Sequence, residues 1–148
     1  MHKFDILQRS PLFHMLAPAE LTLTAELSRE VRLEPGELVF EEGEPGDSLF
    51  IIGEGEVEIL RHDESGAPKL IGVVGAPGFF GEMALIDKEL RSATVRARTA
   101  CLLLQLSAGN FATLRKHHRD AFTFVIMNIA RVLSSRLREA NARLAGRL

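Results

Sequence analysis

The chain has 148 residues, a single cysteine and no long apolar run. Because one thiol, Cys101, cannot form an internal disulfide, a disulfide-stabilised fold is excluded. No apolar stretch approaches the roughly 20 residues that a membrane-spanning helix needs, so we expect no membrane span. The N-terminus carries no basic and then apolar segment of the secretory kind, and we therefore expect a cytoplasmic protein.

Charge of one sign is not in large excess either. The formal net charge of −2 provides no global attraction to nucleic acid. Hydrophobic residues make up 46% of the chain and charged residues 26%, which is typical of a soluble globular protein. This length and composition predict one domain, residues 1–148, with a core of its own.

Three segments with different patterns follow one another. Residues 1–31 carry helix-spaced apolar residues interrupted by Pro11 and Pro18, which predicts short N-terminal helices. In residues 32–107, short apolar or alternating runs lie between Gly- and Pro-rich turns, which predicts a β-barrel or sandwich. The alternation in residues 93–106 predicts a single strand on the barrel wall, with one buried and one exposed face.

Residues 108–148 are predicted to be helical, and residues 119–148 read as one long helix. The apolar stripe of this helix recurs every three or four residues, at Phe122, Ile126, Ile129, Leu133, Leu137, Ala140, Leu144 and Leu148. A stripe of this length exceeds what a small barrel covers. Its first half can dock on the barrel, and its second half needs a partner, most simply the same helix of a second subunit in a homodimer.

The stretch "GFFGEMALIDKELRSATV", residues 78–95, concentrates the residues that carry chemistry, and we call it the cassette. Gly81 lets a ligand approach the backbone, and a short helix beginning near Glu82 aims unpaired N–H groups outward. Arg91 offers a planar, permanently charged fork for a phosphate, and Glu82 suits a donor such as a ribose 2′-hydroxyl. Together they describe a ribose-phosphate site; the alternative is a helix-start Glu82 and a solvated Arg91.

The segments "FGEMAL" and "RSATV" resemble the phosphate-binding cassette of the cyclic-nucleotide-binding domain family. Upstream, "LEPGELVFEEGEPGDSLFIIGEGEVEI" resembles the first barrel strands of that family with their glycine turns. The resemblance covers nearly the whole chain. It implies a mainly β fold: a jelly-roll (double-stranded β-helix) barrel with N-terminal helices and a long C-terminal helix. It also implies a non-enzymatic sensor that binds cAMP or cGMP and signals through that helix.

The resemblance assigns roles to residues of the cassette. Gly81, Glu82, Met83 and Ala84 would form the cassette helix, and Glu82 would bind the ribose 2′-hydroxyl. Arg91 would bind the equatorial phosphate oxygens. The remaining phosphate contacts would come from Ser92 and Ala93.

The base would be held by residues outside the cassette. Ile71 and Val73 on the preceding strand would pack against it. A long-helix arginine, either Arg136 or Arg131, would close over it as a lid. Some cGMP-selective members carry Thr where this chain has Ser92, which favours cAMP while leaving cGMP open.

DNA-binding members of the catabolite-activator-like branch continue beyond the long helix into a helix-turn-helix domain, whereas channel-like members use the domain as a regulatory module. Because this chain ends at Leu148, we expect it not to bind DNA. The receiving protein partner cannot be named from the sequence.

Two other functions are compatible with the pattern. One is a structural dimerisation module with a degenerate nucleotide pocket. The other is a cupin-type metal enzyme, which needs paired histidines and a carboxylate on barrel strands. His62 is the only histidine within the strand region, so that ligand set is missing and we expect neither a metal nor catalysis. The histidine-rich run at 115–120 is interpreted as a solvated connection between helices.

Overall fold

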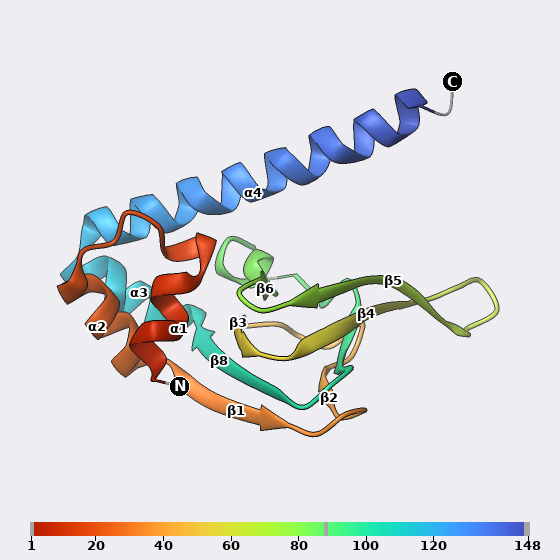
Figure 1. The fold of residues 1–148 in the computed structure, drawn as a ribbon, viewed down its shortest axis with the longest axis horizontal. Coiled ribbons are helices and arrows are strands. Elements are labelled where there is room, and N and C mark those ends of the chain that lie inside the picture. The colour runs from red at the N-terminus through yellow and green to blue at the C-terminus, as the bar shows by residue number, and fades with distance from the viewer. Residues whose placement is uncertain (1, 88, 147–148) are drawn as a thin grey trace.

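The computed structural model of the chain describes residues 2–87 and 89–146 (Figure 1). It confirms a mainly β fold with flanking helices and a long C-terminal helix. The elements in chain order are α1 (Lys3–Arg9), η1 (Pro11–Phe13), α2 (Pro18–Leu27), β1 (Arg29–Leu33), β2 (Leu38–Phe40), β3 (Ser48–Glu54), β4 (Glu56–His62), β5 (Pro68–Gly75), β6 (Phe79–Phe80), η2 (Glu82–Leu85), β7 (Thr94–Ala97), β8 (Cys101–Ser107), α3 (Ala108–His117) and α4 (Arg119–Gly146).

The strands form two four-stranded antiparallel sheets, in the orders β1-β8-β3-β6 and β2-β7-β4-β5. Consecutive strands such as β2 and β3, or β7 and β8, lie in different sheets, so the chain crosses repeatedly between them. The two sheets together form the jelly-roll barrel that the resemblance implies. The β4–β5 hairpin extends beyond the rest of the barrel, away from α1, α2 and α3 and on the same side as the C-terminal end of α4 (Figure 1).

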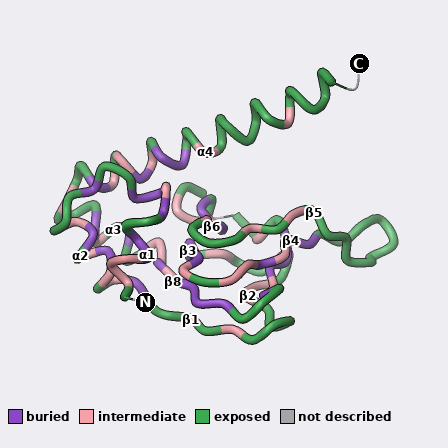
Figure 2. The backbone as a smooth tube through the Cα atoms, viewed as in Figure 1, coloured by how far each residue is buried: buried purple, intermediate pink, exposed green. Residues whose placement is uncertain are grey.

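Most residues of β3 and β8 are buried (Figure 2), and their hydrophobic side chains divide between two core clusters on opposite faces of the sheet. Within β8, Leu103 belongs to the cluster inside the barrel, whereas Leu102 and Leu104 belong to the cluster beneath the helices. Phe50 and Ile51 on β3 divide in the same way. Because both faces are covered, these strands read as continuous apolar runs instead of alternating ones.

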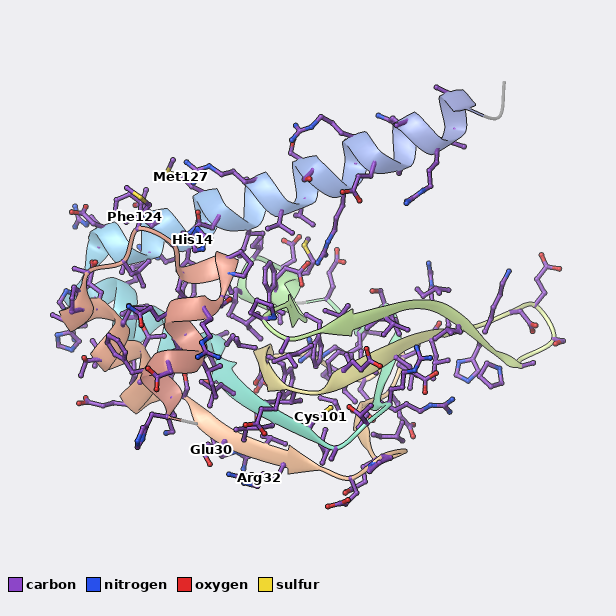
Figure 3. All side chains as sticks on the ribbon, viewed as in Figure 1. His14, Glu30, Arg32, Cys101, Phe124 and Met127 are labelled. Atoms are coloured by element: carbon purple, nitrogen blue, oxygen red, sulfur yellow. The ribbon has the colours of Figure 1, made fainter. Side chains whose placement is uncertain are left out.

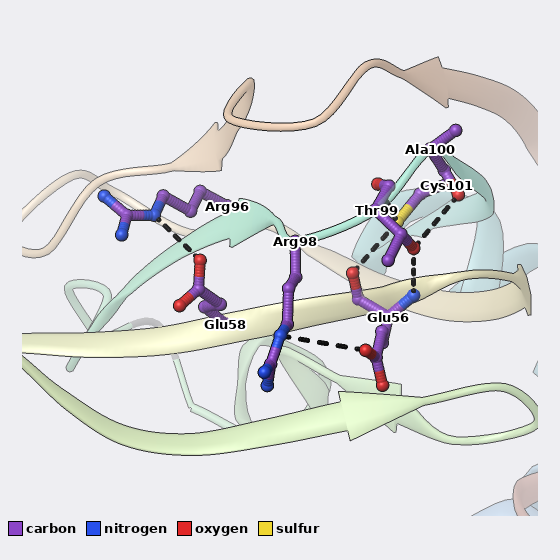
Figure 4. Close-up of polar contacts among 7 residues, drawn as sticks. All are labelled: Glu56, Glu58, Arg96, Arg98, Thr99, Ala100 and Cys101. Carbon is purple, nitrogen blue, oxygen red and sulfur yellow. Dashed lines mark hydrogen bonds and ion pairs between the residues drawn. The ribbon is translucent and has the colours of Figure 1, made fainter.

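The prediction of a single strand over residues 93–106 is wrong, because a turn separates β7 from β8. The turn is held by Thr99, whose hydroxyl accepts a hydrogen bond from the Glu56 backbone N–H at 3.1 Å (Figure 4). The Cys101 thiol donates to the Glu56 carbonyl at 3.3 Å. Thr99 itself is exposed, whereas Val95 and Cys101 are buried as the alternation predicts.

The helices lie within the two segments predicted to be helical, and two details differ from the prediction. The barrel begins earlier than residue 32, since β1 starts at Arg29, and a 3-10 helix, η1, lies between the two predicted N-terminal helices. The first half of α4 packs mainly on η1 and α3, and its buried Val125 and Ile129 belong to the same hydrophobic cluster as side chains of β3 and β8. Buried Asn128 anchors it by donating hydrogen bonds to the carbonyls of Leu12 at 3.0 Å and His14 at 2.9 Å.

Most of the second half of α4 is exposed, as its apolar stripe predicts. Leu137 is 62% exposed and Leu144 59% exposed. Met127 lies on the side of α4 that faces away from the barrel (Figure 3). Leu148, the last residue of the predicted stripe, lies outside the described residues. None of the helices in the described ranges is long and apolar enough to cross a membrane.

Candidate functional site

A cavity of about 610 Å³ lies where the cassette, the barrel and α4 meet. This volume is within the range of small-molecule sites in proteins. Its lining comprises Phe40, Ile59, Val73, Val74, Gly75, Phe79, Phe80, Gly81, Glu82, Met83, Ala84, Asp87, Glu89, Leu90, Arg91, Ser92, Ala93, Val95 and Arg136. Apolar strand residues therefore face two arginines and several carboxylates across one cavity.

The short helix predicted near Glu82 is present as η2, a 3-10 helix of four residues. Gly81 precedes it with a φ of 77°, a left-handed conformation that favours glycine. A Cβ at this position would lie 2.9 Å from Arg91 Nη1 and 3.0 Å from the Ser48 carbonyl oxygen. Gly81 is therefore required twice, for the backbone turn and for the space that Arg91 occupies.

The Arg91 guanidinium is enclosed by the barrel wall. Its Nη2 donates a hydrogen bond to the Ser48 carbonyl at 2.8 Å, and its Cζ lies 4.0 Å from the centroid of the Phe40 ring. A Cβ at Gly46 would come within 2.5 Å of Arg91 Nε. Two glycines and an aromatic ring thus fix the direction of the arginine.

The backbone of Arg91 is bound to the loop between β2 and β3. Its N–H donates to the Glu44 carbonyl at 2.7 Å, and its carbonyl accepts from the Gly43 N–H at 2.8 Å. These two bonds position the C-terminal end of the cassette independently of the side chain. The Arg91 side chain therefore extends into the cavity from a segment that two backbone hydrogen bonds hold in place.

The charge of Arg91 is not fully compensated. Burial lowers the pKa of its guanidinium, and the nearby Asp47 and Glu44 carboxylates oppose this effect. Arg91 Nε is buried and has no hydrogen-bond partner among the described residues. A buried, unpaired donor on a cation costs free energy, and such groups are found where an anionic ligand binds.

Glu82 is 8% exposed, which is unusual for a carboxylate without a close partner. Its Oε1 lies 3.6 Å from Nη1 of Arg136, whose side chain is half-exposed on α4. This distance is an ion pair and not a short hydrogen bond, so the carboxylate retains capacity to accept hydrogen bonds. Arg136 also lies over the Phe79 ring, with Cζ 5.8 Å from the centroid.

The structure brings most of the predicted site residues to this cavity. Val73 is 39% exposed and lines the cavity, together with every cassette residue to which the resemblance assigned a role. Ile71 is 53% exposed on β5 and does not line the cavity. It lies at an irregularity of β5, between the partners of Ile59 and Leu60, and residues two apart share a face only where a strand is regular. Arg131 does not line the cavity either: its Nη1 donates to Asn128 Oδ1 at 3.0 Å.

Sequence reasoning missed the residues that orient the arginine. Phe40 stacks on Arg91, and Gly46 makes room for it, although neither lies in the cassette. Phe40 in turn packs against Phe50 and Phe80 with ring centroids 5.9 Å apart in both pairs. The only sequence signal was the glycine-rich turn that contains Gly46.

No group of three or more His, Cys, Asp or Glu side chains is arranged to hold a metal within residues 2–87 and 89–146. The barrel histidine, His62, lies 3.3 Å from the Glu42 carboxylate. His62 ends β4, Glu42 lies in the loop between β2 and β3, and neither residue lines the cavity.

Comparison with known proteins agrees with this geometry. Residues 30–118 match the family described as "Cyclic nucleotide-binding domain". The Cyclic AMP receptor protein of Thermus thermophilus is 33% identical over 135 residues, which cover 91% of this chain and 61% of that protein. A cyclic nucleotide-gated potassium channel of Mesorhizobium japonicum is 37% identical over 115 residues, which cover 77% of this chain and 30% of the channel.

Among solved structures, the N-terminal domain of a transcriptional regulator from Streptomyces coelicolor A3(2) is 33% identical with a TM-score of 0.78, and the match covers 95% of each chain. The chain spans less than two thirds of the length of the two relatives named above. The family match includes the cassette and the cavity-lining strands and covers more than half of the chain. The chain belongs to the cyclic nucleotide-binding domain family.

Proposed function

We propose that this chain binds a purine cyclic nucleotide, cAMP in the first place, in the cavity beside the cassette and acts as a non-enzymatic sensor. The observation that carries the proposal is Arg91: a half-buried cation whose buried Nε has no hydrogen-bond partner among the described residues, held in one direction by Gly46, Gly81 and Phe40. Relatives of the chain include a cAMP receptor protein and the regulatory domain of Toxoplasma gondii PKA, which was crystallised with cAMP.

The cavity residues fit the chemical parts of such a ligand. Arg91 would pair with the phosphate, assisted by Ser92 and by the backbone at Ala93. Glu82, with its free acceptor capacity, would accept from the ribose 2′-hydroxyl. The N–H groups of Glu82 and Met83 at the start of η2 would complete the cradle, whereas the Ala84 N–H already donates to the Gly81 carbonyl at 3.2 Å.

The base would lie between the apolar wall and α4. Val73 lines the cavity on the barrel side, and Arg136 reaches the cavity from α4. We infer that Arg136, and not Arg131, is the lid over the base, because only Arg136 lines the cavity. A hydroxyl at Ser92 is compatible with either purine, and our proposal favours cAMP.

The output would pass through α4. The Glu82–Arg136 ion pair joins the cassette directly to this helix, so a ligand that engages either residue changes the environment of α4. The exposed leucines Leu133, Leu137 and Leu144 on its second half suit a homodimer formed by two copies of α4. The cytoplasmic location and the expected lack of DNA binding stay predictions.

Titration calorimetry of the purified chain with cAMP, cGMP and adenosine 5′-monophosphate tests this proposal. We expect binding of a cyclic nucleotide and much weaker binding of the open monophosphate, because only the cyclic ester presents a compact monoanion to the cradle. If neither cyclic nucleotide binds at millimolar concentration, the sensor is refuted. The alternative, a dimerisation module with a degenerate pocket, then takes its place if light scattering shows a dimer.

A further inference from the structure

A second recess, of about 800 Å³, lies outside the cyclic-nucleotide cavity, where α3 ends and α4 begins. It is lined by Ala112, Arg115, Lys116, Arg119, Phe122 and Thr123. The lining contains three cations and no carboxylate. Neither the family resemblance nor the proposed sensor uses this recess.

None of the three cations has a carboxylate partner in the part of the chain that the structure describes. Among residues 2–87 and 89–146, no carboxylate lies within ion-pair distance of Arg115, Lys116 or Arg119, and the recess is open to solvent. In contrast, several barrel arginines are paired, such as Arg96 with Glu58 at 3.2 Å. The positive potential of the recess is therefore available to an external anion.

Helix stability explains only some of these charges. Arg115 and Lys116 lie in the last turn of α3, where cations interact favourably with the helix dipole. Arg119 is the first residue of α4, where the dipole disfavours a cation. The helix dipole therefore does not account for Arg119, although Asp120 in the same turn supplies a favourable negative charge, and an anion bound in the recess would add to that stabilisation.

The floor of the recess is apolar. Ala112 and Phe122 line it beside the cations, and the Arg115 guanidinium lies over the Phe122 ring with Cζ 5.3 Å from the centroid. Phe122 packs in turn on Phe111 in the core beneath the helices, with ring centroids 5.1 Å apart. A ligand for this recess therefore combines negative charge with an apolar group.

We propose that this recess is a docking site for a short acidic segment of a protein partner that carries an apolar side chain. The carboxylates would pair with Arg115, Lys116 and Arg119, and the apolar side chain would contact Phe122. A nucleic acid fits less well, because the cations form one compact group instead of a stripe, and the chain as a whole carries a net charge of −2.

The location gives the docking site a clear relation to the rest of the molecule. Helix α3 contacts both η2 in the cassette and the first half of α4. A partner bound at the end of α3 therefore touches the element that joins the cassette to α4. The docking proposal itself does not depend on nucleotide binding and can be tested without nucleotide.

The probe is a fluorescein-labelled nonapeptide with one central phenylalanine and four glutamates on each side, followed by fluorescence anisotropy on the full chain. Two charge-reversal pairs alter the net charge equally: Lys116→Glu with Arg119→Glu in the recess, and Arg138→Glu with Arg143→Glu on the exposed end of α4. We expect the recess pair to weaken binding at least ~30-fold and the distal pair less than ~3-fold, because close charge pairs dominate over distant screened ones.

Further peptides separate the alternatives. Replacing the central phenylalanine by serine should weaken binding several-fold, because contact with Phe122 is lost. Equal losses from both charge-reversal pairs would overturn the proposal in favour of bulk electrostatics. A 20-base-pair DNA duplex that binds more tightly than the peptide, and with the same dependence on Lys116 and Arg119, would replace it with a nucleic-acid site. Inorganic phosphate that displaces the peptide at concentrations where sulfate and chloride have no effect would replace the proposal with a free-phosphate site.

The variants must remain folded for this comparison. Circular dichroism and thermal melting establish this for each pair. If the recess pair unfolds, Lys116→Gln with Arg119→Gln removes the charges without introducing repulsion, and the same loss of peptide binding is expected. Full peptide affinity in a folded glutamine pair would refute the docking site.

Discussion

Arg136 on α4 lies 3.6 Å from Glu82 at the start of the cassette helix, which makes it the ion pair that joins α4 to the cassette in the described residues. The glutamate is buried and the arginine half-exposed, so the pair bridges the interior of the cavity and the solvent-facing helix. A ligand hydroxyl that engages Glu82 would share this carboxylate with Arg136. The contact thus couples the proposed ribose site to the element that would carry the output.

Arg91→Ala should abolish tight binding of cAMP while leaving the fold intact. The substitution removes the main cation opposite the phosphate, and losing one partner of a desolvated charge pair costs ~2–5 kcal/mol, which is roughly thirty-fold to several thousand-fold in affinity. Arg91→Lys should rescue binding only partly, because it keeps the charge without the planar fork. Calorimetric titration measures both, and wild-type affinity in Arg91→Ala would show that the phosphate binds elsewhere.

Glu82→Gln should lower the affinity for cAMP more than the affinity for 2′-deoxy-cAMP, because the proposed role of the carboxylate is to accept a hydrogen bond from the 2′-hydroxyl. A hydrogen bond to a charged group contributes ~1.5–3 kcal/mol, so the difference between the two ligands should be at least about tenfold. The four affinities of wild type and variant for both ligands form one cycle. Equal losses for both ligands would remove the ribose role from Glu82.

Arg136→Ala should reduce the affinity for cAMP modestly and uncouple α4 from the ligand. A lid contact of ~1.4 kcal/mol changes the ratio of two states only about tenfold, so a graded response is expected. In hydrogen exchange, cAMP should protect cassette amides in both the wild type and Arg136→Ala. It should change the exchange rates of α4 amides after Ile129 mainly in the wild type. Arg138→Ala, on the exposed face of the same helix, is the control and should behave as wild type. If the hydrogen exchange of α4 did not change at saturating cAMP, signalling through this helix would be refuted.

Gly81→Ala should lower both stability and nucleotide affinity. The residue has a φ of 77°, and its new methyl group would lie 2.9 Å from Arg91 Nη1. Gly66→Ala is the matched control: its φ is 84°, but nothing lies within 4 Å of the added carbon. Both variants should lose ~1–3 kcal/mol of unfolding free energy through backbone strain. Only Gly81→Ala should also displace Arg91, so only this variant should lose affinity for cAMP. Equal cAMP affinities in the two variants would contradict the proposed fit between Gly81 and Arg91.

Asn128→Ala should destabilise the attachment of α4 to the N-terminal helices. The amide of Asn128 satisfies the carbonyls of Leu12 and His14, and leaving buried acceptors unsatisfied costs ~1–3 kcal/mol. Asn141→Ala, on the exposed part of the same helix, should have almost no effect. Denaturant unfolding compares the two, and equal midpoints would show that these hydrogen bonds do not contribute measurably to stability.

Local patterns in the sequence predicted a large part of this structure. The three segments, the long α4 and the glycine before a short helix at Glu82 follow from periodicity and from turn residues, which act over a few neighbouring positions. The limits of this reasoning appear at residues 93–106. There the alternation continues through a turn, because Thr99 keeps the right spacing while its side chain holds the turn to Glu56.

By itself, the sequence determined which residues are available for chemistry, since the spacing of Gly81, Glu82 and Arg91 requires no knowledge of distant contacts. Tertiary structure alone decided which of two long-helix arginines reaches the cavity: Arg131 pairs with Asn128 within its own helix, whereas Arg136 points to Glu82. It also decided the direction of Arg91, which depends on Phe40 and Gly46, 51 and 45 positions earlier in the chain. Long, flexible side chains take their orientation from whatever packs around them, and that surrounding comes from parts of the chain that no local pattern connects.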